Sequence, residues 1–169
     1  MKSATVWKNL SITGSIGTIK KKKKRNSMIH RNEFGAYYQK HYKTGLGVEV
    51  GVQNGYFAQE ILKDWKGELK CVDRWIEPAE EGMAESILGR DRMVKGDSVE
   101  SAKLFEDESL DFVFIDAGHR YEEVKADIEA WFPKVRKGGI VSGHDYVEYN
   151  DFGVIQAVDE FVKDRYTLE

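Results

Sequence analysis

Short apolar runs alternate with amphipathic segments from residue 46 onward. The apolar runs predict five strands, at Leu46–Val52, Leu69–Val72, Arg92–Lys95, Leu110–Ile115 and Gly139–Ser142. Between and after them, apolar residues recur every three or four positions, which is the pattern of helices with one buried face. Three predicted helices are Tyr56–Trp65, Tyr121–Val135 and Val154–Lys163. A fourth begins at Pro78 and has Met83, Ile87 and Leu88 inward, and a fifth is capped by Ser98 and runs to about Phe105.

This repeated strand–helix order predicts an α/β fold. We expect a Rossmann-like, doubly wound and mostly parallel sheet with right-handed crossovers and helices on both faces. Ligands of such sheets bind at the carboxyl ends of the strands, near the reversal of strand order. The segments to inspect therefore follow the strands, at Gly51–Gly55, Asp73, Gly96–Ser98, Asp116–His119 and Gly143–Tyr146.

The sequence before residue 46 lacks this strand–helix alternation. Ala4–Ile12 and Ser15–Lys22 flank a turn and are candidates for a hairpin, and Asn32–Lys43 is expected to be a helix. We divide the chain into a leader over residues 1–31 and one domain over residues 32–169.

Composition narrows the class of protein. The chain has 169 residues, 41% hydrophobic and 33% charged, which is typical of one globular domain. Its single cysteine, Cys71, excludes an internal disulfide framework and a cysteine-based zinc finger. We find no apolar run long enough to span a membrane and no signal-peptide pattern, so we expect a cytoplasmic protein without a membrane partner.

The net charge of −3 conceals an asymmetry. Residues 1–44 have eleven Lys and Arg against one acid, whereas residues 45–169 have an excess of thirteen acids. The run from Lys20 to Arg25 carries much of the basicity. A solvated flank is the favoured interpretation, and an arm that binds nucleic acid is the alternative.

The first two strand ends carry a glycine turn and an aspartate. The turn at Gly51–Gly55 has neither the Gly-Lys-Ser/Thr of a phosphate loop nor a clean G-x-G-x-x-G pattern. Glu49 beside it would repel a phosphate and suits a cationic or hydroxyl-bearing ligand. Asp73 follows 22 residues after Gly51, a spacing at which carboxylates accept hydrogen bonds from ribose hydroxyls.

The later strand ends carry more acids and two histidines. Asp97 is able to accept from an exocyclic amine, and Ser98 is expected to cap the following helix. Asp116 and Asp145 suit a hard divalent cation such as Mg²⁺, with His119 as a general base. The alternative is that these side chains only cap loops. His30 and His41 are expected at the surface.

Five motifs together resemble a known enzyme family. Glu49-x-Gly51-x-x-x-Gly55, Asp73, Gly96-Asp97-Ser98 and Phe114-Ile115-Asp116 resemble class I S-adenosylmethionine-dependent methyltransferases. Residues 112–128, with Trp131, Gly138-Gly139 and Gly143–Tyr146, are similar to the small-molecule O-methyltransferase group that includes macrolide-sugar methyltransferases and cephalosporin-hydroxylase-like proteins. The resemblance covers about residues 33–163.

The resemblance implies roles for individual residues. Glu49 and the Gly51–Gly55 turn would hold the methionine part of S-adenosylmethionine, Asp73 the ribose, and Asp97 with Ser98 the adenine. The full cofactor-binding set is Glu49, Gly51, Val52, Asn54, Gly55, Asp73, Arg74, Asp97, Ser98 and Asp116. A metal such as Mg²⁺ would bind Asp116, His144 and Asp145, although His144 replaces a residue that is often acidic. His119 matches the family's proposed base, and the implied acceptor is a hydroxyl of a small molecule.

Other classes stay open. A nucleic-acid methyltransferase would use the Lys20–Arg25 run, but Asp116-Ala-Gly-His stands where amino-directed DNA enzymes carry an Asn/Asp-Pro-Pro-Tyr/Phe motif. An inactive S-adenosylmethionine-binding module and a dinucleotide-dependent oxidoreductase are the remaining alternatives. The family's usual C-terminal strand pair is shortened or absent in this sequence, and a truncated chain is one explanation. The alternatives are that Ala4–Lys22 fills the open sheet edge or that this edge supports a homodimer.

Overall fold

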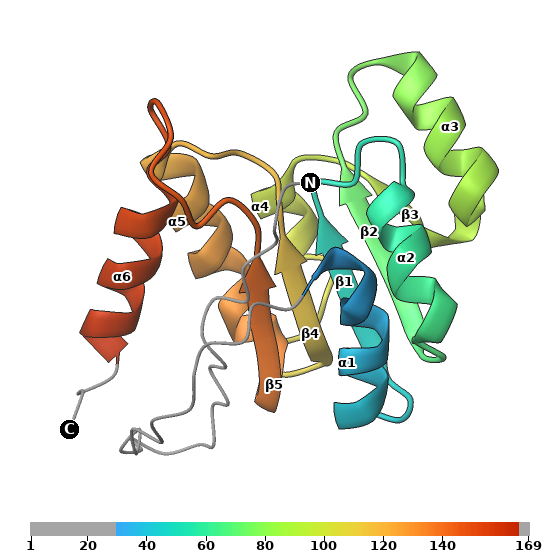
Figure 1. The fold of residues 1–169 in the computed structure, drawn as a ribbon, viewed down its shortest axis with the longest axis horizontal. Coiled ribbons are helices and arrows are strands. Elements are labelled where there is room, and N and C mark those ends of the chain that lie inside the picture. The colour runs from blue at the N-terminus through green and yellow to red at the C-terminus, as the bar shows by residue number, and fades with distance from the viewer. Residues whose placement is uncertain (1–29, 166–169) are drawn as a thin grey trace.

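The computed structural model describes residues 30–165, which form one parallel five-stranded sheet. The strands are β1 (Leu46–Val50), β2 (Glu68–Asp73), β3 (Met93–Lys95), β4 (Leu110–Ile115) and β5 (Val135–Gly143). Their order is β3-β2-β1-β4-β5, every neighbouring pair is parallel, and the strands end at the same edge of the sheet (Figure 1). The doubly wound α/β prediction is therefore confirmed.

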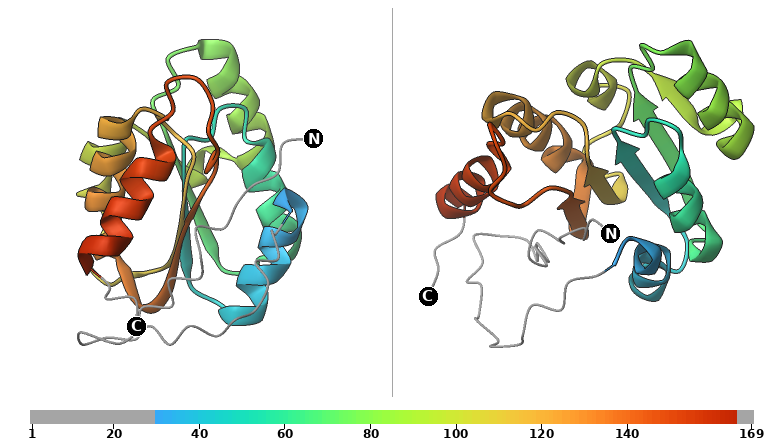
Figure 2. Two further views of the ribbon diagram at one scale, coloured as in Figure 1. Left: turned by 60° about the vertical axis from the view of Figure 1, so that its left-hand side comes forward. Right: turned by 45° about the horizontal axis from the view of Figure 1, so that its top comes forward.

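Six α-helices cover the two faces of the sheet. Helices α1 (Phe34–His41), α2 (Tyr56–Asp64) and α3 (Pro78–Leu88) lie on one face (Figure 2). Helices α4 (Ser98–Ala102), α5 (Tyr121–Trp131) and α6 (Val154–Arg165) lie on the other. Short 3₁₀ turns occur at Arg31–Glu33, Arg90–Arg92 and Phe132–Lys134. This three-layer arrangement buries both faces of the sheet.

Strand β4 shows how the sequence builds both layers. All six of its residues are buried. Alternate side chains of a strand point to opposite faces, so Phe112 and Phe114 pack with α1 and α2, whereas Val113 and Ile115 pack with α5 and α6. The Tyr38 ring of α1 stacks on Phe112 with centroids 3.6 Å apart. Continuous burial explains why the strand lacks an apolar–polar alternation.

The strand order reverses between β1 and β4. From β1 the chain continues to β2 and β3 on one side of the sheet, and β4 begins the other side. Gly51 follows β1 with φ +86°, and a Cβ there would lie 2.2 Å from the carbonyl oxygen of Asp116. Only glycine lets the loops after β1 and β4 approach each other this closely. The reversal therefore brings two of the predicted site segments together.

Three local predictions were wrong. Met83 was expected inward but is 44% exposed, because α3 buries Ala84 together with Leu88, which was correctly predicted inward. Asp97, rather than Ser98, caps α4, and its carboxylate accepts from the backbone N–H groups of Val99 and Glu100.

The helix predicted to reach Val135 ends at Trp131. Pro133 lies in the 3₁₀ turn that follows, and Val135 already belongs to β5. A proline inside the predicted helix is the physical reason for the early end, since it has no N–H to donate to the preceding turn.

The predictions for the N-terminal segment, the sheet edge and membrane crossing can be compared with the structure only in part. Helix α1 lies within the predicted Asn32–Lys43 helix, whereas the Ala4–Lys22 hairpin and the Lys20–Arg25 run lie outside the described residues. Among residues 30–165, β5 is an outer strand of the sheet, and dimerisation through it stays a prediction. None of the helices in this part of the chain is long and apolar enough to cross a bilayer.

Candidate functional site

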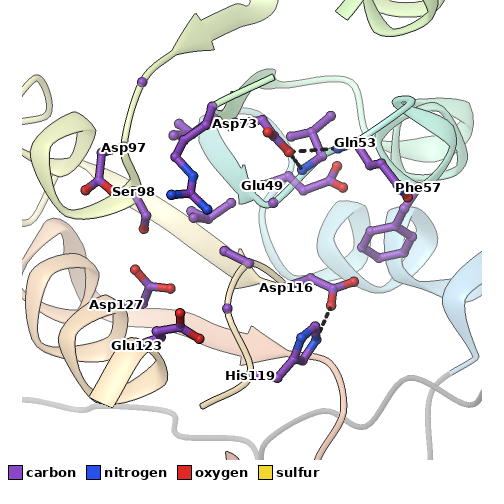
Figure 3. Close-up of a pocket in the computed structure, with 18 of the residues that line it drawn as sticks. Glu49, Gln53, Phe57, Asp73, Asp97, Ser98, Asp116, His119, Glu123 and Asp127 are labelled. Atoms are coloured by element: carbon purple, nitrogen blue, oxygen red, sulfur yellow. Dashed lines mark hydrogen bonds and ion pairs between the residues drawn. The ribbon is translucent and has the colours of Figure 1, made fainter. Parts of the chain in front are cut away.

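A cavity of about 580 Å³ opens at the carboxyl ends of the central strands (Figure 3). Nine of the ten predicted cofactor-binding residues line it, as does His119. The exception is Gly55, which does not line the cavity and where an added Cβ would lie 3.1 Å from the Leu88 side chain of α3. The lining also includes residues that the sequence did not single out, among them Arg31, Phe57, Glu123 and Asp127.

The Asp73 carboxylate holds the turn after β1 in place. Its Oδ2 accepts from the backbone N–H groups of Val52 at 2.7 Å and Gln53 at 2.8 Å. Its Oδ1 accepts from the N–H of Trp75, whose indole N–H in turn donates to the carbonyl of Gln53. These bonds fix the backbone of the turn while leaving lone pairs of the carboxylate for a ligand.

Glu49 forms part of the inner wall. It projects from β1 into the cavity, is 1% exposed, and its Oε2 has no hydrogen-bond partner among residues 30–165. Burial raises the pKa of its carboxyl well above the usual range, the negative charges of Asp116 and Asp73 add to this, and Arg31 opposes it. A buried carboxylate without a donor suits a ligand that brings a cation or hydrogen-bond donors.

Arg31 reaches the cavity from the turn ahead of α1. Its Nη2 donates to Asp116 Oδ2 at 2.8 Å, and its guanidinium lies 4.7 Å from the centre of the Phe57 ring. Its Nε is shielded from solvent and has no partner in the described chain. This residue ends the predicted leader, and nothing in its sequence context distinguishes it from the other cations there.

Four polar residues gather at the end of the cavity that lies away from Phe57. Figure 3 shows them as Asp97, Ser98, Glu123 and Asp127. Ser98 Oγ accepts from the indole N–H of Trp131 at 3.0 Å. Burial raises the pKa of Asp127 to about 6, and a hydrogen bond with Ser98 opposes this shift. Glu123 and Asp127 are four residues apart on α5, so a helical wheel would have placed both on one face.

Two histidines and two aspartates meet beside the cavity, after β4 and β5. His119 Nε2 lies 2.8 Å from Asp145 Oδ2 and 3.6 Å from Asp116 Oδ1. The nearby carboxylate of Asp116 and the charge of Asp145 raise the pKa of His119, and burial opposes them. The His119 ring stacks on Phe152, with centroids 4.6 Å apart.

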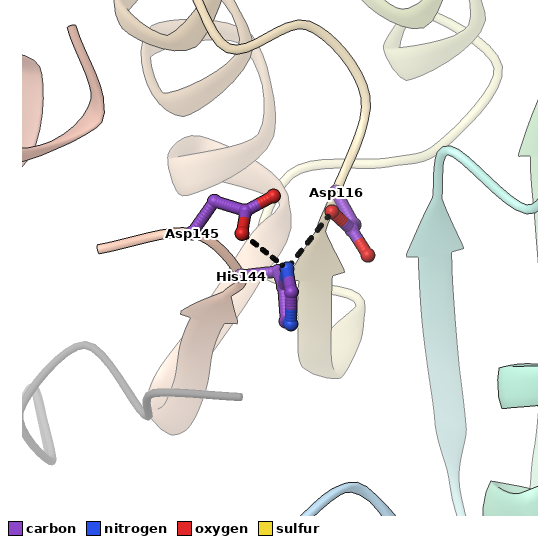
Figure 4. Close-up of side chains that lie close together, drawn as sticks. All are labelled: Asp116, His144 and Asp145. Atoms are coloured by element: carbon purple, nitrogen blue, oxygen red, sulfur yellow. Dashed lines mark ion pairs between the residues drawn. The ribbon is translucent and has the colours of Figure 1, made fainter. Parts of the chain in front are cut away.

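The ligand atoms of Asp116, His144 and Asp145 lie within 4.8 Å of one another (Figure 4). His144 is 5% exposed, and its Nδ1 lies 3.0 Å from Asp145 and 3.7 Å from Asp116. Two carboxylates and an imidazole are a donor set that a divalent cation accepts. The sequence thus predicted a cluster of three side chains that the fold brings together.

Comparison with known proteins gives the family context. A family model described as a methyltransferase domain matches residues 48–146, more than half of the chain. A curated protein of Sinorhizobium fredii, Uncharacterized protein y4gI, is 28% identical over 161 residues, and the match covers 85% of this chain and 18% of that protein. The chain therefore spans less than a fifth of this relative's length.

Solved structures share the fold. An O-methyltransferase from Bacillus cereus in complex with SAH is 18% identical, with 79% of this chain and 66% of that chain covered and a TM-score of 0.61. A putative rRNA-methylase from Clostridium thermocellum is also 18% identical, with 76% of each chain covered and a TM-score of 0.62.

Proposed function

The chain belongs to the methyltransferase-domain family, and from that premise we propose that it transfers a methyl group from S-adenosylmethionine to a hydroxyl oxygen of a small molecule. The observation that carries this proposal is the position of His119. It lines the proposed cofactor cavity and lies near the carboxylates of Asp116 and Asp145. A proton acceptor is therefore present where the methyl donor and an acceptor held by these carboxylates would meet.

The cavity residues fit the three parts of the cofactor. Glu49 has an unpartnered oxygen for the ammonium group of the methionine part. Asp73 keeps lone pairs for the ribose hydroxyls while it holds the turn. Asp97 and Ser98 lie at the opposite end, where an exocyclic amine of adenine would find acceptors. When bound, S-adenosylmethionine supplies the electrophilic methyl group on its sulfonium.

His119 is the proposed base. In the proposed reaction His119 would take the hydroxyl proton of the acceptor, whose oxygen would receive the methyl group that S-adenosylmethionine would supply, with S-adenosylhomocysteine as the leaving group. Asp145 and Asp116 stabilise the resulting imidazolium, since both carboxylates favour its charged form. Holding the two reactants in line accounts for much of the expected acceleration.

The cluster of Asp116, His144 and Asp145 is the proposed metal site. A divalent cation such as Mg²⁺ bound there would lower the pKa of an acceptor hydroxyl. His144 is a softer ligand than the acid it replaces, so Mn²⁺ belongs in the same test. The ring of Phe152, beside His119 and 5.3 Å from that of Tyr149, supports an aromatic surface for the acceptor.

Calorimetric titration of the purified chain with S-adenosylhomocysteine, without metal and with Mg²⁺ or Mn²⁺, tests the proposal. We expect the wild type to bind S-adenosylhomocysteine with micromolar affinity and Asp73→Ala to abolish this binding. We also expect the wild type to bind Mg²⁺ or Mn²⁺ more tightly than a His144→Ala variant does, when the metal itself is titrated. Absence of binding under every condition would contradict the proposed cofactor. Binding without methyl transfer to any hydroxyl acceptor would favour a binding module, and transfer to RNA would favour the nucleic-acid alternative.

A further inference from the structure

One donor in the cavity wall has no role in the proposed reaction. The Nε–H of Arg31 is buried and has no acceptor among residues 30–165, although Nη2 of the same guanidinium donates to Asp116. Buried N–H groups are almost always paired, so a shielded donor on a residue that lines the cavity suggests that a bound ligand supplies its acceptor. The cation–π contact with Phe57 holds the guanidinium over this part of the cavity.

A carboxyl group that also lacks a partner lines the same cavity. Glu49 lines the cavity with an oxygen that lacks a partner within the described residues, and the positive charge of Arg31 lowers the pKa of its carboxyl. A ligand that satisfies both groups carries an ammonium for Glu49 and a carboxylate for Arg31. An α-amino acid group has both charges on one carbon and therefore fits the pair.

We propose that Arg31 binds the α-carboxylate of the cofactor's methionine portion and so selects ligands with an intact amino acid group. The inference rests on the proposed function, because S-adenosylmethionine is the ligand that brings this carboxylate. Nε–H and Nη2–H of one guanidinium form a fork that matches the two oxygens of a carboxylate. In the bound state the Arg31 guanidinium pairs with the ligand carboxylate instead of with Asp116. The Asp116 carboxylate is then available on the side of the site where the methyl acceptor binds.

Three nucleoside probes separate this role from a structural one. S-adenosylhomocysteine carries both charges, its decarboxylated analogue 5′-(3-aminopropylthio)adenosine keeps only the ammonium, and 5′-methylthioadenosine carries neither. Calorimetry on the full chain would compare them in the wild type, in Arg31→Gln and in Arg31→Lys. Arg90→Gln is the matched control, since Arg90 pairs with Glu81 at the surface and does not line the cavity.

We expect the wild type to bind S-adenosylhomocysteine about 10- to 100-fold more tightly than the decarboxylated analogue. Arg31→Gln should erase this difference and leave the affinity for 5′-methylthioadenosine unchanged, while Arg31→Lys keeps part of it. Arg90→Gln should behave as the wild type.

Equal loss of all three ligands in Arg31→Gln, or no loss of any, would overturn the assignment of Arg31 while the cofactor proposal stands. If the wild type binds none of the three probes, the proposed function fails and this inference fails with it. A melting temperature within a few degrees of the wild type establishes that the Arg31→Gln chain is folded.

Discussion

The carboxylate of Asp73 accepts a hydrogen bond of 2.8 Å from the backbone N–H of Gln53, across the end of two neighbouring strands. The same oxygen accepts from Val52 at 2.7 Å. A residue predicted only as a ribose ligand therefore also fixes the turn that shapes the cavity. Loss of this carboxylate is therefore expected to lower both the affinity for the ligand and the stability of the turn.

Asp73→Asn tests this double role. The amide nitrogen cannot accept hydrogen bonds, so at least one of the three backbone donors loses its partner, at a cost of about 1–3 kcal/mol. We expect a lower melting temperature and at least a tenfold loss of S-adenosylhomocysteine affinity. Asp64→Asn, at the exposed end of α2, is the control. Unchanged stability in Asp73→Asn would contradict the role in fixing the turn.

Gly51→Ala tests the close approach at the reversal of strand order. The new Cβ would lie 2.2 Å from the Asp116 carbonyl oxygen, and φ is +86°. We expect a loss of more than about 2 kcal/mol in the free energy of unfolding, measured by urea denaturation. Gly82→Ala is the matched control, because its added Cβ in helix α3 would meet nothing within 4 Å beyond its chain neighbours and the helix's own backbone. There the same change should stabilise by up to about 1 kcal/mol.

The strands were predictable because their cause is local. Residues 110–115 form a buried apolar run between turn residues, and the predicted bounds of this strand equal those of β4. The end of α5 and the cap of α4 were missed because several residues compete for each position. Asp97 and Ser98 are both good capping residues, and the backbone geometry gives the role to Asp97.

The candidate site was predictable where its residues follow strands. Parallel strands end at one edge of a sheet, so the strand pattern alone was enough to expect Glu49, Asp73 and Asp116 close together. Arg31 and Asp127 were missed because they reach the cavity from a turn ahead of α1 and from the buried face of α5. Their positions depend on how these segments pack, which no spacing within the sequence encodes.

His119→Gln tests the proposed base. Glutamine keeps a polar side chain but cannot take up the proton, so we expect turnover to fall by about 10²- to 10⁴-fold. The affinity for S-adenosylhomocysteine should change less than twofold. Formation of S-adenosylhomocysteine from S-adenosylmethionine, with phenol and sugar acceptors, measures the rate, and His41→Gln on the exposed part of α1 is the control. Full turnover in His119→Gln would remove this residue from the mechanism.

Asp127 should make stability depend on pH. Burial raises the pKa of its carboxyl to about 6 in the folded chain, from 3.8. Below about pH 4 the carboxyl is protonated in both states and carries no penalty. Between pH 4 and 6 the unfolded chain releases this proton while the folded chain keeps it, so the contribution to stability falls as pH rises. Above about pH 6 the penalty is complete and on the order of 2–3 kcal/mol.

Asp127→Asn isolates this effect, because the amide has nearly the same shape and does not titrate. The measurement is urea denaturation of both chains at several values between pH 4 and pH 7. We expect the unfolding free energy of Asp127→Asn, minus that of the wild type, to rise with pH across this range. Other carboxyls cancel in the difference, and so does any constant cost of the amide. A difference that stays flat or falls would mean that Asp127 ionises in the folded chain as readily as in the unfolded one.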